Sequence, residues 1–479
     1  MTDERAVQVH GQWALLRFSV ISRLLAQPAP PGELAGELER LAETVWQHPV
    51  TGEPVRFARS TIERWYYVAR TDTDPMRVLR RKVRRDRGSQ RTISAALAAV
   101  VHEQYTAHSS WSYQLHLDNL AVRVAEDPRL GSLPSYASLR RYLLAHDLTR
   151  QRRRPSRELE QRAAASRSRR EVRSYEAEYV GGLWHLDFHH GSHKILTAGG
   201  EWVRPLLLAI LDDRSRLLCH AQWYLDETAQ SLVHGLVQAF LKRGLPRALL
   251  SDNGAAMLAR EMREGLARLS ILQQTTLPYS PYQNGKQEII WAQVEGRLLA
   301  MLEGQSDLTL ALLNEATQAW IEMEYQRRVH AETRQTPLAR WLDGPSVLRP
   351  CPGVDELRLA FTASHTRAQR QSDGTVTLEG VRFEIPARFR TLRRVDLRYA
   401  SWNLGHVWLM DESAGVPLAR LYPLDRARNA EGVRRPLEAP GPAAEAPVQT
   451  GIAPLLRQLM AEYAATGLPP AYIPQEEDR

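Results

Sequence analysis

The chain has 479 residues, and its 43% hydrophobic content supplies several buried cores, which excludes a globally disordered protein. Lys and Arg number 63 against 55 Asp and Glu, and the resulting net charge of +8 favours a polyanionic partner. The only cysteines, Cys219 and Cys351, exclude a disulfide framework and a cysteine-based zinc site. They suit a reducing cytoplasm, and with no signal-type apolar core and no run of about 18 apolar residues we expect a cytoplasmic protein without a membrane span.

Residues 1–85 are predicted to form a helical DNA-binding domain. Apolar residues recur at helical spacing over 13–26 and 32–46, and a basic, aromatic third helix covers 61–70. Ser60 followed by Glu63 is a capping-box pattern for the start of that helix. A short basic third helix is typical of a helix-turn-helix module, so Arg64 and Arg70 are expected to contact DNA. The alternative is a plain three-helix bundle.

Residues 86–150 are predicted to form a second helix-turn-helix domain. Helical patterns cover 92–106, 113–126 and 135–146, and Ser135 is a good N-cap for the last. In that helix Arg140 and Arg141 are candidates for DNA contact.

A basic linker is expected at 151–178. Ten arginines lie between Arg150 and Arg173 against three glutamates, and we expect Arg152, Arg153 and Arg154 to follow the phosphates of bound DNA. The alternative is a solvated charged face.

The pattern changes to a mixed α/β domain at 179–345. Apolar runs predict strands at 183–189, 203–212, 217–225, 248–251 and 271–276. Amphipathic patterns predict helices at 228–243, 257–269, 285–302 and 309–325. Three strands followed by alternating helices and strands indicate a mixed sheet covered by helices.

The remaining chain is predicted to contain a small β-barrel and a tail. Short strands with turns at regular spacing fill 346–430, which favours the barrel. Residues 431–479 are a Pro/Ala-rich linker and a compact helix at 452–466. Its apolar face, with Leu455, Leu456, Leu459, Met460 and Tyr463, suits docking on a partner.

Asp187, Asp252 and Glu288 are the candidate catalytic residues and metal ligands. Asp187 lies in a predicted strand, Asp252 ends the apolar run 248–250, and Glu288 closes the polar segment 279–288. Three converging carboxylates can hold two divalent cations, which clamp the attacking and leaving oxygens of a phosphoryl transfer. The rival carboxylates Asp212 and Asp213 are interpreted as turn and packing residues.

A zinc site is the alternative for this region. His185, Asp187 and His189 alternate along the predicted strand and therefore share one face.

Residues 179–340 resemble the catalytic domain of the retroviral-integrase superfamily, in the form found in bacterial insertion-sequence transposases. The matching motifs are Trp-His-Leu-Asp at 184–187, Leu-Asp-Asp-Arg-Ser-Arg at 211–216, Ser-Asp-Asn-Gly at 251–254, the segment 279–288 with Asn-Gly-Lys-Gln-Glu at its end, and Tyr-Gln-Arg-Arg at 325–328 with Thr-Pro at 336–337. Tandem helix-turn-helix units before the core and a small barrel after it are similar to the Mu transposase group.

The resemblance implies a multidomain protein with an RNase H-like core and the activity of a DDE transposase. Asp187, Asp252 and Glu288 would hold two Mg²⁺ or Mn²⁺ ions, and Asn284 and Lys286 would contact the DNA end. The implied partners are double-stranded DNA, further copies of the chain assembled on it, and an AAA+ ATPase bound through the tail. Two other functions stay open: a transposase-derived sequence-specific DNA-binding protein, and an RNase H-like nuclease that does not join strands.

Overall fold

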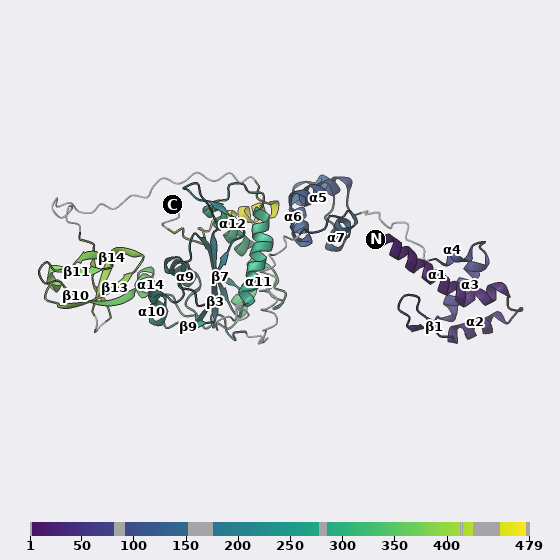
Figure 1. The fold of residues 1–479 in the computed structure, drawn as a ribbon, viewed down its shortest axis with the longest axis horizontal. Coiled ribbons are helices and arrows are strands. Elements are labelled where there is room, and N and C mark those ends of the chain that lie inside the picture. Colours follow the sequence, from purple (N-terminus) through teal and green to yellow (C-terminus); the bar gives the residue numbers. More distant parts are fainter. Residues whose placement is uncertain are drawn as a thin grey trace. The chain divides into compact units, whose positions relative to one another are not determined.

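The architecture is taken from a computed structural model that describes residues 2–80, 92–151, 176–276, 285–411, 413, 415–424 and 451–475. The chain divides into two compact units, Met1–Arg91 and Thr92–Arg479. Figure 1 shows their helices and strands. In the described part of the chain, none of the helices combines the length and the apolar character that crossing a membrane requires.

The first unit is helical, as the sequence predicts. It contains α1 (Thr2–Ala26), α2 (Leu34–Glu43), α3 (Arg59–Arg70) and α4 (Pro75–Leu79). A hairpin of β1 (Trp46–Gln47) and β2 (Pro54–Val55) lies between α2 and α3. Apolar residues of α1, α2 and α3 share one core, with Ile21, Leu38 and Ile62 fully buried.

The predicted capping box of the third helix is wrong. Helix α3 begins at Arg59, which places Ser60 inside the helix, and its N-cap is Ala58, whose methyl side chain cannot accept a hydrogen bond. The helix starts here because burial of Ile62 and Tyr66 outweighs the missing cap. The helix-turn-helix assignment stays a prediction.

The second unit begins with three further helices, α5 (Ala95–Ala107), α6 (Tyr113–Glu126) and α7 (Tyr136–Ala145). Each follows a serine whose hydroxyl accepts a backbone N–H of the first turn: Ser94, Ser112 and Ser135. A short 3₁₀ turn, η1 (Pro128–Leu130), connects α6 to the loop before α7.

Helix α6 and the loop before it fix these helices to the rest of their unit. The Trp111 indole N–H donates to the carbonyl of Ala300 at 2.9 Å, and the Arg297 guanidinium donates to Asp118 at 2.5 Å. Trp111 and Leu115 are buried in the same apolar cluster as the helices of the central domain. Helix α7 therefore belongs to a region that is packed, through α6, against the helices of the central domain.

The central sheet has the strand order β7-β6-β3-β8-β9. Its strands are β3 (Trp184–His190), β6 (Leu206–Asp212), β7 (Leu218–Tyr224), β8 (Ala248–Ser251) and β9 (Leu272–Thr275). The first three pair antiparallel, whereas β3, β8 and β9 run parallel. This arrangement confirms the predicted mixed α/β domain. The small hairpin of β4 (Ile195–Leu196) and β5 (Trp202–Val203) lies outside the sheet.

Helices cover both faces of the sheet, as Figure 1 shows. One face packs on α9 (Ala229–Arg243) and α10 (Arg260–Arg268), and the other on α11 (Gly285–Gln293) and α12 (Leu310–Met323). Successive side chains of β6 point to opposite faces of the sheet. Leu208 and Ile210 are buried on the face covered by α9 and α10, and Leu207, Ala209 and Leu211 on the face covered by α11 and α12.

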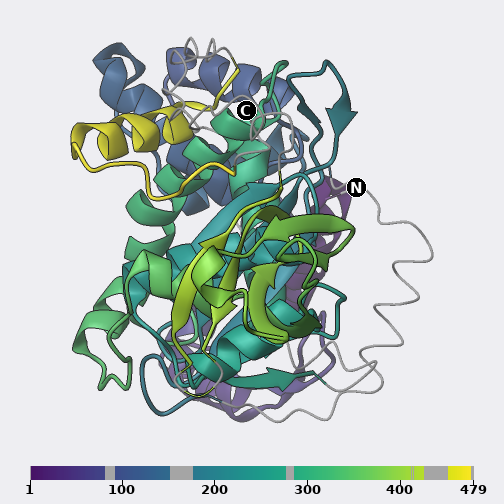
Figure 2. The same ribbon diagram turned by 90° about the vertical axis from the view of Figure 1, so that its left-hand side faces the viewer.

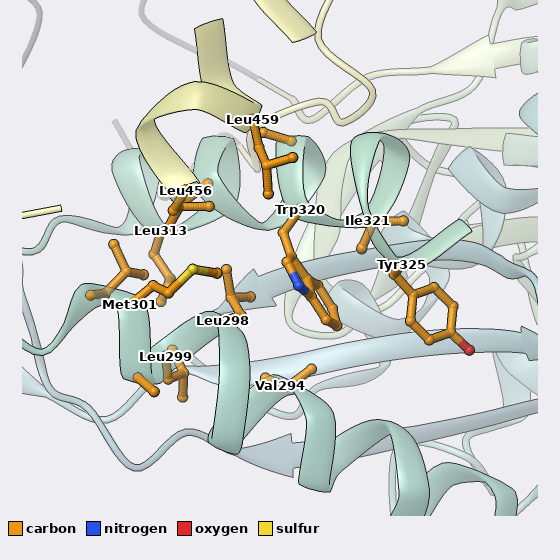
Figure 3. Close-up of a cluster of buried hydrophobic side chains, with 14 of the residues drawn as sticks. Val294, Leu298, Leu299, Met301, Leu313, Trp320, Ile321, Tyr325, Leu456 and Leu459 are labelled. Carbon is orange, nitrogen blue, oxygen red and sulfur yellow. The ribbon is translucent and has the colours of Figure 1, made fainter. Parts of the chain in front are cut away.

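The helix predicted over 285–302 changes its winding. After α11 the chain forms a π-turn, η3 (Val294–Leu298), and then a 3₁₀ turn, η4 (Leu299–Leu302). The change keeps Val294, Leu298, Leu299 and Met301 inside the apolar cluster (Figure 3). The chain then continues through η5 (Tyr325–Arg327), α13 (Pro337–Asp343) and α14 (Val354–Ala360).

The C-terminal β region consists of two small sheets around one core. Strands β10 (Ala363–Ala368), β13 (Arg394–Ala400), β14 (Asn403–Met410) and β15 (Pro417–Leu421) pair antiparallel in that order. Strands β11 (Thr375–Leu378) and β12 (Val381–Glu384) form a hairpin, and η6 (Ala387–Phe389) follows it. Phe383, Leu397 and Leu409 lie in the shared core. The barrel itself stays a prediction.

The tail helix α16 (Pro454–Ala465) packs on its own chain. Leu456, Leu459 and Met460 are buried in the cluster that includes Leu313 and Trp320 of α12 (Figure 3). The Leu455 N–H donates to the side-chain oxygen of Asn119 in α6 at 3.0 Å, and Figure 2 shows α16, in yellow, beside the blue helices of that region. The apolar face predicted to dock on a partner is therefore covered largely by α12 and α6 of the same chain, and the structure does not support binding of an AAA+ ATPase through it.

Candidate active site

The polar residues of β3 lie on one face of the strand. Trp184 and Leu186 enter the core under α9, so His185, Asp187 and His189 face the α11 side of the sheet. The His189 imidazole lies 2.8 Å from Glu295 and stacks on Trp291, with ring centroids 4.9 Å apart. The predicted alternation is confirmed, and each histidine has a carboxylate partner from another element.

Asp187 and Asp252 lie close together just beyond the paired stretch of β3 and β8. His185 of β3 pairs with Leu250 of β8, Asp187 and Asp252 each lie two residues further along the chain, and the charge of Asp252 acts on Asp187. Asp252 follows the last residue of β8, and its carboxylate accepts the Gly254 N–H at 3.0 Å. The structure therefore brings together two of the three predicted ligands.

The electrostatics of Asp187 reflect this proximity. Burial, and next the charge of Asp252, raise the pKa of Asp187 to about 6, while hydrogen bonds from the Trp291 indole and the Phe188 backbone act in the opposite direction. The charge of Glu227 also raises this pKa. The excess negative charge and the oxygen-only donors suit a hard divalent cation.

Glu227 is a third carboxylate of this site that the sequence analysis missed. It lies between β7 and α9, and a Cβ atom at Gly254 would stand 3.1 Å from an oxygen of both Asp252 and Glu227. Partial burial and the charge of Asp252 raise the pKa of Glu227, and His190 opposes the shift. Acidic residues are common just before a helix, so the sequence around Glu227 carried no signal that distinguished it.

Glu288 lies on α11, and its side chain is exposed. Two later residues of the same segment contact β3: Trp291 bonds to Asp187, and Glu295 bonds to His189. Glu288 lies one helical turn before Trp291. Within the described residues, no three side chains of His, Cys, Asp or Glu are already arranged to hold a metal ion. The predicted triad is thus partly assembled: Asp187 and Asp252 are adjacent, with Glu288 on the helix that faces them.

Asp212 and Asp213 are both fully buried, and they differ in role. Asp212 accepts hydrogen bonds from the N–H groups of Gly181 and Ser215 and from the Ser215 hydroxyl, the turn role that the sequence indicated. Asp213 accepts the Ala177 N–H at 2.5 Å and bonds to His185 at 2.6 Å and to the ammonium of Lys286.

The charges around Asp213 outweigh its burial. Burial alone would raise the pKa of the Asp213 carboxyl, but hydrogen bonds and charges from His185 and Lys286 hold it well below its usual value. Burial lowers the pKa of Lys286 although Asp213 favours its charged form. We therefore read the group as an ion pair whose carboxylate is firmly ionised.

The predicted DNA-binding arginines of the helical regions are on the surface. Arg64 and Arg70 are exposed on α3, and Arg140 and Arg141 are exposed on α7. The predictions for Arg152, Arg153, Arg154 and Asn284 lie outside the described residues.

The comparisons with known proteins agree with this geometry. Residues 177–281 match the model of the integrase core domain family, a stretch that contains Asp187, Glu227 and Asp252. The matched stretch and the mixed sheet covered by helices on both faces support an integrase-type, RNase H-like catalytic core in this part of the chain. The general class of activity that this domain match supports is polynucleotidyl transfer in DNA integration or transposition. No curated protein matches the chain.

The chain is also similar to several solved structures. These include a simian T-cell lymphotropic virus intasome in complex with the PP2A regulatory subunit B56 gamma (16% identity, 52% of this chain and 78% of that chain, TM-score 0.31). A second is the catalytic core domain of BIV integrase (22% identity, 34% and 95%, TM-score 0.27). A third is the HTLV-2 integrase catalytic core domain in complex with magnesium (20% identity, 35% and 98%, TM-score 0.27). At these TM-scores the structures add nothing to the assignment, which depends on the family model and on the residues themselves.

Proposed function

We propose that the protein is a DNA transposase that binds the ends of a mobile element, nicks at their 3′ ends and joins the freed 3′-hydroxyls to target DNA. The observation that carries this proposal is the proximity of Asp187, on β3, to Asp252, directly after the adjacent parallel strand β8, in a stretch that matches an integrase core domain. Glu288 lies on the helix packed against the same strand face.

Asp187, Asp252 and Glu288 would hold two Mg²⁺ or Mn²⁺ ions, since the donor set consists of carboxylate oxygens alone. When bound, such ions activate the attacking oxygen and stabilise the leaving 3′-oxygen of an in-line displacement. Glu227 adds negative charge beside Asp252, which strengthens the attraction for cations.

The residues of the site position the reacting groups and supply no covalent nucleophile. The Trp291 indole holds the Asp187 carboxylate, and Gly254 leaves space between Asp252 and Glu227 that a side chain would fill. The same site serves both steps because only the attacking oxygen changes, from water in nicking to a DNA 3′-hydroxyl in joining.

DNA would be held by the surface arginines of both helical regions. Arg64 and Arg70 of α3 and Arg140 and Arg141 of α7 are exposed and available for this contact, and further contacts are expected from Arg152, Arg153, Arg154 and Asn284. Joining two element ends to one target requires more than one copy of the chain on the DNA, so we expect a homo-multimer there.

A plasmid strand-transfer assay tests the proposal. The donor carries the DNA that flanks the gene, and joined products are measured for wild type, Asp252→Asn and Glu288→Gln. Each variant loses several kcal/mol of charge stabilisation, so the rate at which joined products form should decrease by at least about 100-fold. The matched control is Glu315→Gln, an exposed glutamate of α12 that should leave the rate unchanged. Equal activity of Asp252→Asn and wild type refutes the mechanism.

The same assay separates the two alternative functions. A transposase-derived DNA-binding protein would bind the donor ends and give neither nicks nor joined products. An RNase H-like nuclease would give nicks that depend on Asp252 and no joined products.

A further inference from the structure

The strand that carries Asp187 and the helix that carries Glu288 are linked by a buried ion pair. Asp213, at the end of β6, is fully buried and bonds to His185 on β3 and to Lys286 on α11. His185 lies two residues before Asp187, and Lys286 lies two residues before Glu288. The network therefore joins the backbone segments of two proposed ligands.

Gln287 adds a second attachment next to the first. Its side chain is fully buried and donates to the carbonyl of Ala209 at 3.2 Å. Ala209 of β6 is the register partner of Asp187 on β3. Two consecutive residues of α11 thus fasten its first turn to the sheet at the level of the proposed site, and Glu288 is the next residue.

The first and last contacts between β3 and the α11 segment are separated by about the same length along both elements. From His185 to His189 the strand rises roughly 13 Å at about 3.3 Å per residue. From Lys286 to Glu295 a helix rises roughly 13 Å at about 1.5 Å per residue. His189 bonds to Glu295 at the far end, the Trp291 indole bonds to Asp187 in the middle, and Lys286 closes the near end through Asp213.

Lys286 is therefore the most N-terminal of these attachments and lies two residues before Glu288. The first turn of a helix lacks intrahelical partners for its N–H groups and frays easily unless tertiary contacts hold it. Glu288 lies in that turn, and its exposed side chain makes no hydrogen bond or ion pair with the described residues.

We infer that Lys286 is a positioning residue: its ion pair with Asp213 sets the place of Glu288 relative to Asp187 and thereby the affinity of the site for divalent cations. The inference rests on the proposed function of the three carboxylates. It differs from the expected contact of Lys286 with the DNA end, because the lysine side chain is only 19% exposed and its partner Asp213 is 0% exposed. A buried carboxylate cannot touch DNA, so a variant of Asp213 separates the two roles.

The experiment measures Mn²⁺ binding to the full-length protein without DNA, from the electron paramagnetic resonance signal of free Mn²⁺. Loss of a residue that orients a ligand typically weakens metal affinity 10- to 100-fold. Lys286→Met is expected to raise the Mn²⁺ Kd by about 10- to 100-fold, and Asp213→Asn to do the same. The double variant should be no weaker than either single variant, because the two residues act as one unit.

Two further measurements make the result specific. The affinity of Lys286→Met for a plain DNA duplex is compared with that of Lys194→Met. Lys194 is an exposed lysine of the same domain, so both variants lose one positive charge. The two lysine variants are expected to bind the duplex equally. Hydrogen exchange should increase at residues 286–290 of α11 in Lys286→Met and stay unchanged in α12, which also tests the role if Asp213→Asn does not fold.

The outcomes are distinct. An unchanged Mn²⁺ Kd for Lys286→Met, together with duplex binding weaker than that of Lys194→Met, overturns the inference in favour of direct DNA contact. Asp252→Asn reports on the site itself: if it binds Mn²⁺ like the wild type, the proposed ligand set is refuted and the inference falls with it. If Asp252→Asn loses Mn²⁺ and Lys286→Met does not, only the inference fails.

Discussion

Replacing Leu456 by alanine is expected to loosen the tail helix from the core. Leu456 of α16 is fully buried in the apolar cluster that also contains Leu313 of α12 and Met301 of η4 (Figure 3). Alanine is a strong helix former, so the substitution does not weaken α16 as a helix. Its effect comes from the contacts and the cavity that the lost side chain leaves.

The size of the effect follows from the burial of the site. Leucine-to-alanine changes at fully buried positions cost about 2–5 kcal/mol, and the flexible side chain of Met301 allows some collapse into the cavity. We take about 3 kcal/mol, which corresponds to an increase of about 100-fold in the fraction of molecules with α16 detached. Because Leu455 of α16 is bonded to Asn119, part of the loosening should extend to α6.

Native-state hydrogen exchange measures this directly. Amides of α16 should exchange about 100-fold faster in Leu456→Ala, since exchange follows the local opening equilibrium. The control is Gln458→Ala, an exposed position of the same helix whose amide bonds to Glu462. Unchanged protection of α16 in Leu456→Ala, or equal acceleration in the control, refutes the packing argument.

Three further predictions follow from other parts of the fold. Arg140→Ala should weaken duplex binding and reduce the slope of log Kd against log salt by about 1, whereas an unchanged slope means that α7 does not contact phosphates. Gly265→Ala should destabilise the protein by about 1–3 kcal/mol in urea unfolding, because the new methyl group meets the buried ring of Phe361; an unchanged midpoint contradicts this packing. Burial lowers the pKa of His116 from 6.5 to about 4, so the unfolded chain takes up a proton that the folded chain does not as pH falls below 6.5. Stability should drop by about 2 kcal/mol between pH 7 and pH 5, and His116→Gln should remove that drop in thermal unfolding.

The strands of the central sheet were predictable because their pattern is local. The apolar run around Leu206 and Leu211 and the alternation at His185, Asp187 and His189 each specify a strand and its faces. The helix ends were predictable where a side chain marks them, as Thr228 does for α9 by accepting the Ser231 N–H. The start of α3 was missed because burial of its inner face fixed it, and no capping residue marks it.

Contacts between distant segments were not predictable from pattern alone. The apolar face of α16 indicates that something covers it, but the sequence does not say whether the cover is a partner or the protein's own α12. Asp212 and Asp213 both look like turn residues. Only the register of β6 and the position of α11 determine that Asp213 meets Lys286.

The three proposed ligands differ in what fixes them, and this difference decides where the site is sensitive. Asp187 is held in β3 by the antiparallel pairing with β6, and Asp252 comes directly after β8, which pairs parallel with the start of β3. Glu288 is not held by strand pairing. Its position depends on the side-chain contacts of Lys286 and Gln287 in the first turn of α11. Substitutions that weaken the turn should therefore reduce metal affinity without unfolding the sheet, whereas substitutions within β3 should do both.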